Sequence, residues 1–380
     1  MRLAVYTNQI YSCLRCGFCF DHAVGGQEKI CPSYVTYGME SYGARGKMAI
    51  ARALVDGALD YDADVAKRVY ACTECGACEE QCFKYLSLLE IYRAMKADLA
   101  ERELVPAELA GVGRAVADAG NPYGQARGKR LGWAPGTDRV GKKAETVLFV
   151  GCTPAYVRRG IARGAYQVLE AAGVDFALLD DEVCCGHPHL AVGDLEGARE
   201  AAGKNVAAIE ASGATQVVFA CPGCLQMFRE EVPDLLGRPL PFRVLHATEL
   251  LGERRAAGSV RLRKQSRVVV YHDPCNLGRG LGIYDAPRRA IDAVPGARRV
   301  EMRRSGAGSF CCGNGDFVRF GYEPMAVENE EARWNEAVAT GADLLLSACP
   351  ACQIAFLDAK RRAKSTVDVL DVVEWLATAI

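Results

Sequence analysis

Eighteen of the 380 residues are cysteine, and eight of these lie in two short runs in the N-terminal quarter of the chain. The first run is spaced C-x2-C-x2-C with a further cysteine before Pro32, and the second is spaced C-x2-C-x2-C-x3-C. The residues are Cys13, Cys16, Cys19 and Cys31, followed by Cys72, Cys75, Cys78 and Cys82. Such runs predict two cubane 4Fe-4S clusters, because the x2 spacing lets a tight loop place three thiolates on three corner irons.

In paired runs of this kind, the fourth cysteine of each run binds the other cluster. We therefore expect two ligand sets: Cys13, Cys16, Cys19 with Cys82, and Cys72, Cys75, Cys78 with Cys31. Zinc is the alternative metal, but a third cysteine at another x2 spacing is untypical of zinc knuckles. The runs depart from the usual pattern in having eleven residues before Cys31 and Phe83, not proline, after Cys82.

The remaining ten cysteines form two sets of five with matching spacing. The first set is Cys152, Cys184, Cys185, Cys221 and Cys224, and the second is Cys275, Cys311, Cys312, Cys349 and Cys352. The surrounding sequence repeats as well, since VVFACPGC in the first half matches LLLSACPAC in the second. Residues 144–380 are therefore an internal duplication.

Each half of the duplication has the pattern of an α/β unit. Short apolar runs such as TVLFV and QVVFA predict buried parallel strands. The first cysteine and the C-P-x-C pair of each half come just after such strands, where open α/β sheets bind ligands. The paired cysteines occupy a loop in which Gly186 or Gly313 permits a tight turn.

Five thiols per half exceed the four that a cubane needs. The fifth is either a spare or the sign of a different cluster, in which adjacent residues reach neighbouring irons and one thiolate bridges. Because the surplus occurs in both halves, we favour the second option and expect two further 4Fe-4S clusters of noncubane type.

The segments between the two N-terminal runs, such as RGKMAIARALVDGAL and DADVAKRVYA, have helical periodicity. Their length resembles that of the α-helical ferredoxin domain of succinate dehydrogenase iron-sulfur subunits. We expect an α+β multidomain chain with a helical ferredoxin-type domain at 1–103, a Gly-, Pro- and Arg-rich linker at 104–143, and CCG domains at 144–258 and 259–380.

The paired pattern C…CCG…C-x2-C, with DPCNLGR in the second half, resembles the CCG-domain family. The combination of this pattern with an N-terminal helical ferredoxin domain is similar to the catalytic subunit of membrane-bound heterodisulfide reductases. It is also similar to the iron-sulfur subunits of anaerobic glycerol-3-phosphate dehydrogenase and of glycolate and lactate oxidases. In heterodisulfide reductases each CCG domain holds a noncubane 4Fe-4S cluster on five cysteines, and the two clusters face each other and cleave the disulfide between coenzyme M and coenzyme B. The resemblance implies the same ligand roles for the ten cysteines here. Asn276 departs from the family pattern, in which histidine is common.

Two functions follow as hypotheses. In the first, the chain is an iron-sulfur oxidoreductase subunit of heterodisulfide reductase type, whose cubanes pass electrons to the two CCG clusters, which reduce or form a disulfide-like substrate. The ten cysteines of the two sets are then the candidate catalytic residues. In the second, the chain is an electron relay between a flavin dehydrogenase and a quinone or cytochrome partner. A metal-storage or scaffold protein would not need two different ligand geometries.

The rest of the sequence limits the partners. It has no flavin, nicotinamide or nucleotide motif, so we expect electrons to be exchanged with another redox subunit of flavoprotein, cytochrome, hydrogenase or dehydrogenase type. A small thiol or disulfide is the expected substrate class. The net charge of −1 argues against nucleic-acid binding. No apolar run approaches the roughly 18 residues of a bilayer span, so a cytoplasmic chain is expected, with membrane association only through a partner.

Three histidines lie near the cysteines. His187 and His189 follow the first CCG, and His187 could protonate a leaving thiolate. The favoured interpretation is a hydrogen bond to a cluster sulfur or to the backbone. His272 and Asp273 are expected to orient the loop before Cys275.

Overall fold

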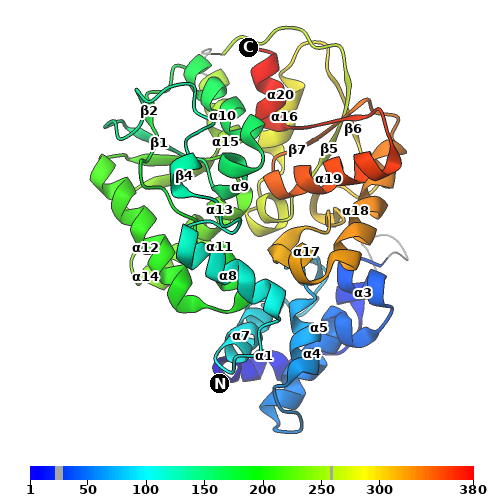
Figure 1. Cartoon of the computed structure of the whole chain (residues 1–380). Coiled ribbons are helices and arrows are strands. Elements are labelled where there is room, and N and C mark those ends of the chain that lie inside the picture. Colours follow the sequence, from blue (N-terminus) through cyan, green and yellow to red (C-terminus); the bar gives the residue numbers. More distant parts are fainter. Residues whose placement is uncertain (22–28, 257–259) are drawn as a thin grey trace.

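The structure is a computed structural model, and it describes residues 1–21, 29–256 and 260–380. Figure 1 shows a helical unit at one end of the molecule and two α/β units side by side on top of it. The N-terminus lies in the helical unit and the C-terminus at the opposite end of the molecule. The predicted boundary between the two CCG domains, at 258 and 259, lies outside the described residues.

The helical unit contains the two segments that were predicted to be helical between the cysteine runs, as α4 and α5. Asp62 accepts a hydrogen bond from the Val65 amide at 2.7 Å and so caps the start of α5. The α-helices of this unit are α1 (Thr7–Tyr11), α2 (Phe18–Asp21), α3 (Pro32–Tyr37), α4 (Ala44–Val55), α5 (Ala63–Tyr70), α6 (Ala77–Glu80) and α7 (Leu88–Ala100). Apolar side chains of α4, α5 and α7 form its core.

The segment from 104 to 143, predicted as a linker, is packed against the rest of the molecule. It contains α8 (Ala107–Ala119), whose Leu109, Val112 and Val116 are buried. Further along, Trp133 is 1 % exposed in the core of the first α/β unit. This segment therefore contributes side chains to the folded units on both of its sides.

The first α/β unit is a parallel sheet with strand order β2-β1-β3-β4. Its strands are β1 (Thr146–Phe149), β2 (Phe176–Ala177), β3 (Gln216–Phe219) and β4 (Arg243–His246). Its helices are α9 (Cys152–Tyr156), α10 (Arg159–Ala171), α11 (His187–Val192), α12 (Leu195–Ser212), α13 (Pro222–Gln226), α14 (Val232–Leu236) and α15 (Ala247–Ala256). Strands β1 and β3 carry almost only buried apolar side chains, as central strands of a parallel sheet do.

The second α/β unit repeats this arrangement, with parallel strands in the order β6-β5-β7-β8. Its strands are β5 (Val268–His272), β6 (Arg298–Glu301), β7 (Leu344–Ser347) and β8 (Asp368–Asp371). Its helices are α16 (Asp285–Asp292), α17 (Val318–Gly321), α18 (Glu323–Val338), α19 (Pro350–Ala363) and α20 (Val372–Thr378). The same strand order in both units is the structural form of the duplication read from the sequence.

The two α/β units share one apolar core. Val147 and Val217 of the first sheet belong to the same cluster of buried side chains as Val269 and Leu344 of the second. Helix α10 of the first unit packs against α20 of the second. The two α/β units therefore pack against each other through buried apolar side chains.

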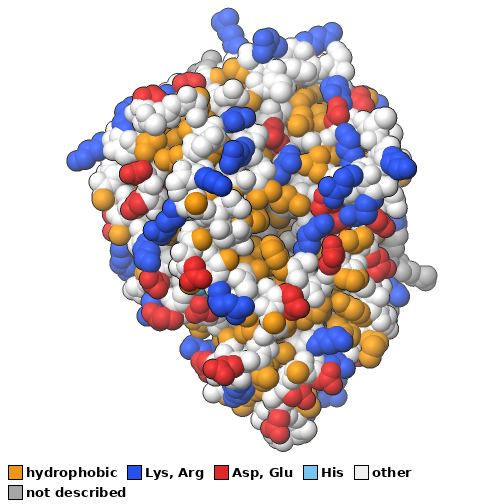
Figure 2. All heavy atoms as spheres, viewed as in Figure 1, with side chains coloured by type: hydrophobic (Ala, Val, Ile, Leu, Met, Phe, Trp, Pro, Cys, Tyr) orange, Lys and Arg blue, Asp and Glu red, His pale blue; other side chains and the backbone are white. Residues whose placement is uncertain are grey.

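On the face drawn in Figure 2, hydrophobic side chains gather in the middle, where the units meet, and charges of both signs surround them. Among the described residues, no helix is both long enough and apolar enough to span a bilayer.

Candidate iron-sulfur sites

The eight N-terminal cysteines line two cavities. Site 1 is lined by Cys13, Cys16, Cys19 and Cys82, and site 2 by Cys31, Cys72, Cys75 and Cys78. Short helices hold them, since α2 and α6 each begin between cysteines of one run and α3 begins directly after Cys31. In this grouping the last cysteine of each run lies with the first three cysteines of the other run. It matches the expectation from the spacing and supports those ligand sets.

The donors at these sites suit iron-sulfur clusters. Burial raises the pKa of Cys19 and of Cys72 to about 12, so neither thiol ionises at neutral pH without a cation beside it. Cluster irons supply such a cation, and a metal-bound cysteine is a thiolate. Sites whose sulfur donors are four cysteine thiols each therefore fit the group that the spacing predicts.

The first five-cysteine set forms site 3, in which the sulfurs make one continuous series of contacts. Cys152 contacts Cys184, which contacts its neighbour Cys185, and this contacts Cys224, which contacts Cys221. Hydrogen bonds from the flanking thiols lower the pKa of Cys185 to about 6. Cys152 begins α9 just after β1, and the C-P-x-C pair lies where β3 leads into α13.

The second set forms site 4 with the same series of contacts. Cys275 contacts Cys311, followed by Cys312, Cys352 and Cys349 in that order. The hydrogen bond from Cys311 holds the pKa of Cys312 well below its usual range, as happens for Cys185 at site 3. All five sulfurs of each set thus lie in one compact site, which supports a ligand role for the fifth cysteine.

The glycine after each cysteine pair shapes the loop. Gly186 and Gly313 have φ values of 98° and 91°, which only glycine adopts readily. A Cβ atom on Gly313 would lie 2.7 Å from the carbonyl oxygen of Ala326, and one on Gly186 would lie 2.9 Å from that of Ala198. The turn lets two adjacent cysteines face one site, which a strand could not do.

Sites 3 and 4 differ in the polar groups around them. At site 3, Arg130 donates to the sulfur of Cys152 at 3.6 Å and pairs with buried Glu182. Glu182 also accepts hydrogen bonds from the backbone amides of Val150 and Gly151. Sequence reasoning missed Arg130, because it lies in the segment predicted as a linker and has no fixed spacing to any cysteine.

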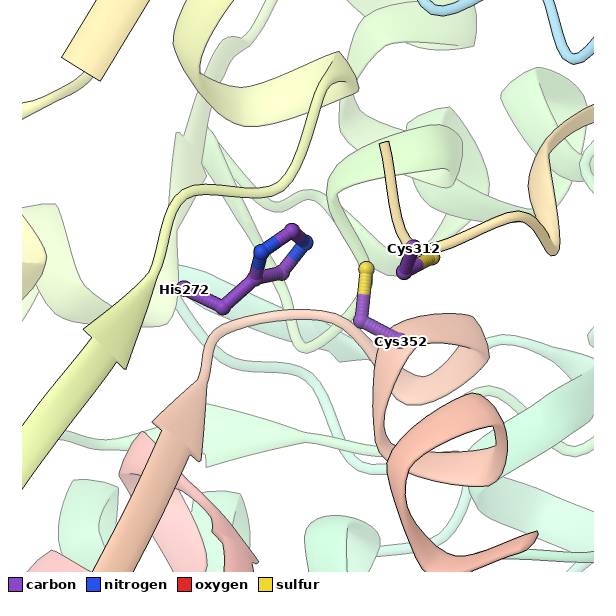
Figure 3. A group of neighbouring side chains, drawn as sticks. All are labelled: His272, Cys312 and Cys352. Carbon is purple, nitrogen blue, oxygen red and sulfur yellow. The ribbon is translucent and has the colours of Figure 1, made fainter. Parts of the chain in front are cut away.

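At site 4, His272 lies against the thiols. Figure 3 shows its ring facing Cys312 and Cys352, and one ligand atom of each of the three residues lies within 4.8 Å of the others. Asp273, which was expected with His272 to orient the loop before Cys275, accepts from Arg288 at 2.5 and 2.8 Å and from the amide of Gly306 at 2.8 Å. A comparison of the two repeated sequences could have singled out His272, because the corresponding residue of the first half, in β1, is Phe149.

Sites 2 and 4 are in direct contact. The thiol of Cys75 at site 2 hydrogen-bonds with Cys311 at site 4, and this lowers the pKa of Cys75 to about 5. Arg279 bridges the two loops, donating to the carbonyl oxygen of Cys75 at 2.6 Å and to that of Ser309 at 2.6 Å. Ligands of two predicted clusters thus touch across the boundary between the helical unit and the second α/β unit.

A buried ion-pair network holds this boundary together. Lys96 of α7 pairs with Glu74, which lies between two site 2 cysteines, and with Asp316, which follows the second CCG. The Nε2 atom of His187 lies 3.6 Å from a carboxylate oxygen of Asp316.

The backbone N–H of His187, not its ring, donates to the sulfur of Cys185. His189 instead contacts Asp194, the capping residue of α12, at 2.7 Å.

Sites 3 and 4 lie near each other, because α9, which begins at Cys152 of site 3, packs against α19, which begins directly after Cys349 of site 4. Asn276, the departure from the family pattern, bridges the two α/β units by donating to Gln226 at 2.7 Å. A cavity of about 940 Å³ opens where this junction meets the helical unit, lined in part by Cys75, Cys275, Asn276, Arg279 and Gln226. Cys275 of site 4 forms part of its wall.

Comparisons with known proteins agree with this architecture. Residues 146–229 and 269–357 match the cysteine-rich CCG domain, and residues 9–86 match the 4Fe-4S dicluster domain. One relative is a subunit of the dihydromethanophenazine:CoB–CoM heterodisulfide reductase of Methanosarcina barkeri. It is 34 % identical, over 99 % of this chain and 95 % of the relative.

Other relatives are more distant. A subunit of the CoM/CoB fumarate reductase of Methanothermobacter marburgensis is 27 % identical, over 83 % of this chain and 62 % of the relative. The probable iron-sulfur-binding oxidoreductase FadF of Bacillus subtilis is 30 % identical, over 85 % of this chain and 49 % of the relative.

Among solved structures, a hypothetical protein from Helicobacter pylori matches with a TM-score of 0.58 at 11 % identity, over 89 % of this chain and 67 % of that one. This likeness concerns the fold alone. The sequence relatives and both domain matches show that the chain belongs to the family of iron-sulfur oxidoreductase subunits that join a 4Fe-4S dicluster domain to two CCG cysteine-rich domains.

Proposed function

We propose that this chain is an oxidoreductase subunit of heterodisulfide reductase type, carrying cubane 4Fe-4S clusters at sites 1 and 2 and noncubane 4Fe-4S clusters at sites 3 and 4. Electrons pass from site 1 to site 2, cross to site 4, and reach a disulfide substrate between the α/β units. The reaction consumes two electrons and two protons and converts one disulfide into two thiols. The heterodisulfide reductase relative matches along nearly the whole chain, which supports this choice.

The contact between Cys75 and Cys311 is the observation that carries the proposal. Each of these residues belongs to the predicted ligand set of a different cluster, so an electron would leave one cluster and arrive at the next through two touching sulfurs. The packing of α9 at site 3 against α19 at site 4 continues the same path to site 3. Two adjacent one-electron clusters suit a two-electron couple such as a disulfide.

The substrate is expected to enter through the 940 Å³ cavity, because Cys275 of site 4 forms part of its wall. A thiol sulfur that reaches this wall can bind an iron of the site 4 cluster. Asn276 and Gln226, which face the cavity from the two α/β units, offer amide groups for hydrogen bonds with the rest of the substrate.

Electrons are expected to enter from a partner protein at site 1. Cys16 of this site is exposed at the surface. Apolar side chains near it are also exposed, with Leu14 at 66 %, Phe83 at 65 % and Tyr85 at 91 %. Exposed apolar residues around a redox centre are suited to a partner that docks close enough for electron transfer.

A second candidate function is electron relay. FadF and the EtfAB:quinone oxidoreductase of Syntrophomonas wolfei, which is 26 % identical over 84 % of this chain, match it over about half of their own length. In a relay, sites 3 and 4 would exchange electrons with a quinone or cytochrome partner, and no thiol would bind them.

Electron paramagnetic resonance of the partly reduced protein with low-molecular-weight thiols distinguishes the two functions. If site 4 acts on a disulfide, one substrate thiol binds an iron of the half-reduced cluster and produces a new paramagnetic species. This species should disappear in Cys312→Ser and persist in the control Cys16→Ser, which alters only site 1. A panel of thiols that leaves the signals of intact clusters unchanged would refute the catalytic function and favour the relay.

A further inference from the structure

The two halves of the duplication differ at one buried position beside the clusters. Phe149 in β1 and His272 in β5 each lie three residues before the first cysteine of their set. Each ring packs on a phenylalanine of the helical segment after the C-P-x-C pair. The ring centroids of Phe149 and Phe228 are 5.2 Å apart, and those of His272 and Phe356 are 4.9 Å apart. The second half therefore has an imidazole where the first has an apolar ring.

Contacts of His272 determine which ring nitrogen carries its proton. Nε of Arg333 donates to Nδ1 of His272 at 3.0 Å. A guanidinium has no acceptor atom, so Nδ1 must be the unprotonated nitrogen, and the ring hydrogen must be on Nε2. Arg333 is itself fully buried and is held by Glu336 at 2.8 Å and by the hydroxyl of Ser309 at 3.1 Å.

With Nδ1 engaged by Arg333, only Nε2–H remains to face the sulfurs of Cys312 and Cys352 (Figure 3). His272 hydrogen-bonds with Cys312, the member of site 4 that corresponds to Cys185 of site 3. The first unit has no imidazole at this place, and there Asn205 holds the cysteine loop by bonding to the backbone of Val183 and Cys184. A hydrogen bond from an imidazole to a sulfur of the cysteine pair is thus a property of the second half, whereas at site 3 Arg130 donates to Cys152, outside the pair.

We propose that His272, with its tautomer fixed by Arg333, donates a hydrogen bond from Nε2 to the Cys312 thiolate and thereby raises the reduction potential of the cluster at site 4. This inference rests on the proposed cluster at that site. Hydrogen bonds to ligand sulfurs stabilise the more negative, reduced state of an iron-sulfur cluster. Since Cys75 of site 2 touches site 4, the higher potential favours retention of the arriving electron next to the substrate cavity.

The test replaces His272 by phenylalanine, the residue of the first half, and by glutamine. The glutamine amide can accept from Arg333 and donate to Cys312 at once, so His272→Gln should keep the wild-type potential. His272→Phe should lower the ratio of reduced to oxidised cluster at site 4 about tenfold at a fixed potential, which equals 59 mV for a one-electron couple. A redox titration followed by electron paramagnetic resonance measures this, with the site 4 signal assigned by its loss in Cys349→Ser.

Three results would overturn the inference. One is an unchanged potential in a fully loaded His272→Phe protein, and another is an equal fall in both variants. The third is a nitrogen hyperfine coupling as large as that of a directly bound imidazole in protein with 15N-labelled histidine. If His272→Phe does not assemble, Arg333→Met tests the same point, because it frees the tautomer and should lower the same potential. Absence of iron and sulfide from site 4 in the wild-type protein would instead refute the proposed function.

Discussion

The buried lysine between sites 2 and 4 provides a sharp test of how the helical unit and the second α/β unit are joined. The side chain of Lys96 is 1 % exposed and pairs with Glu74 at 2.7 Å and with Asp316. Replacement by methionine keeps the length and the apolar part of the side chain but removes its charge. Asp316, whose carboxylate is 2 % exposed, then has no cation in hydrogen-bond contact among the described ion pairs.

The expected cost follows from these contacts. Removal of one partner from a buried ion pair costs about 3–5 kcal/mol, because the remaining charge is left uncompensated in the interior. Glu74 keeps its second cation, Arg93, at 2.7 Å, so the loss falls mainly on Asp316. We therefore expect Lys96→Met to lower the free energy of unfolding by about 3 kcal/mol, which raises the unfolded fraction more than 100-fold.

Urea unfolding of the cluster-loaded protein under anaerobic conditions measures this change, with tryptophan fluorescence and cluster absorption followed together. The control is Lys204→Met, which removes an ion pair of the same 2.7 Å length with Glu200 at a site where both side chains are more than half exposed. Such surface pairs contribute about 0.5 kcal/mol or less. If Lys96→Met falls within 0.5 kcal/mol of the control, the buried network does not hold the units together as described.

Further predictions concern the sites and the pH dependence of stability. Cys78→Ser should alter only the site 2 signal in electron paramagnetic resonance, whereas Cys75→Ser should alter site 4 as well, and identical spectra would contradict the contact between these sites. Gly313→Ala should prevent loading of site 4, because Gly313 has a positive φ and an added Cβ would lie too close to the carbonyl oxygen of Ala326. The loss should amount to about four irons. The control Gly308→Ala should load normally, because its added Cβ would have nothing within 4 Å. Burial lowers the pKa of His246 from 6.5 to about 3. Below pH 6.5 the unfolded chain therefore binds a proton at this ring that the folded protein does not bind, and the folded protein loses stability as the pH falls. Between pH 7.5 and 5.5 His246→Phe should lose about 1.4 kcal/mol less than wild type in urea unfolding, and equal losses would refute this.

The parts of the fold that sequence predicted well have local causes. Buried strands such as TVLFV are recognisable because all residues after Thr146 are apolar. The matching C-P-x-C segments reveal the duplication without any alignment. The turn after each cysteine pair was predictable because glycine has a special backbone freedom at Gly186 and Gly313. These features depend on a few neighbouring residues, so sequence reasoning reaches them.

The parts that sequence missed depend on contacts between distant segments. Arg130 reaches Cys152 only because the segment before β1 packs against the first unit. Cys75 touches Cys311 only because the helical unit docks on the second α/β unit. No spacing rule encodes such docking. His272 is an intermediate case, because comparison with Phe149 marks the position and only the structure shows its contact with Cys312.

We propose that this chain carries four iron-sulfur clusters, one at each of sites 1 to 4. Quantification of iron, acid-labile sulfide and zinc in anaerobically purified protein decides whether it does. We expect about sixteen irons per chain with matching sulfide, four for each cluster. Stoichiometric zinc with little sulfide would rule out iron-sulfur clusters at these sites.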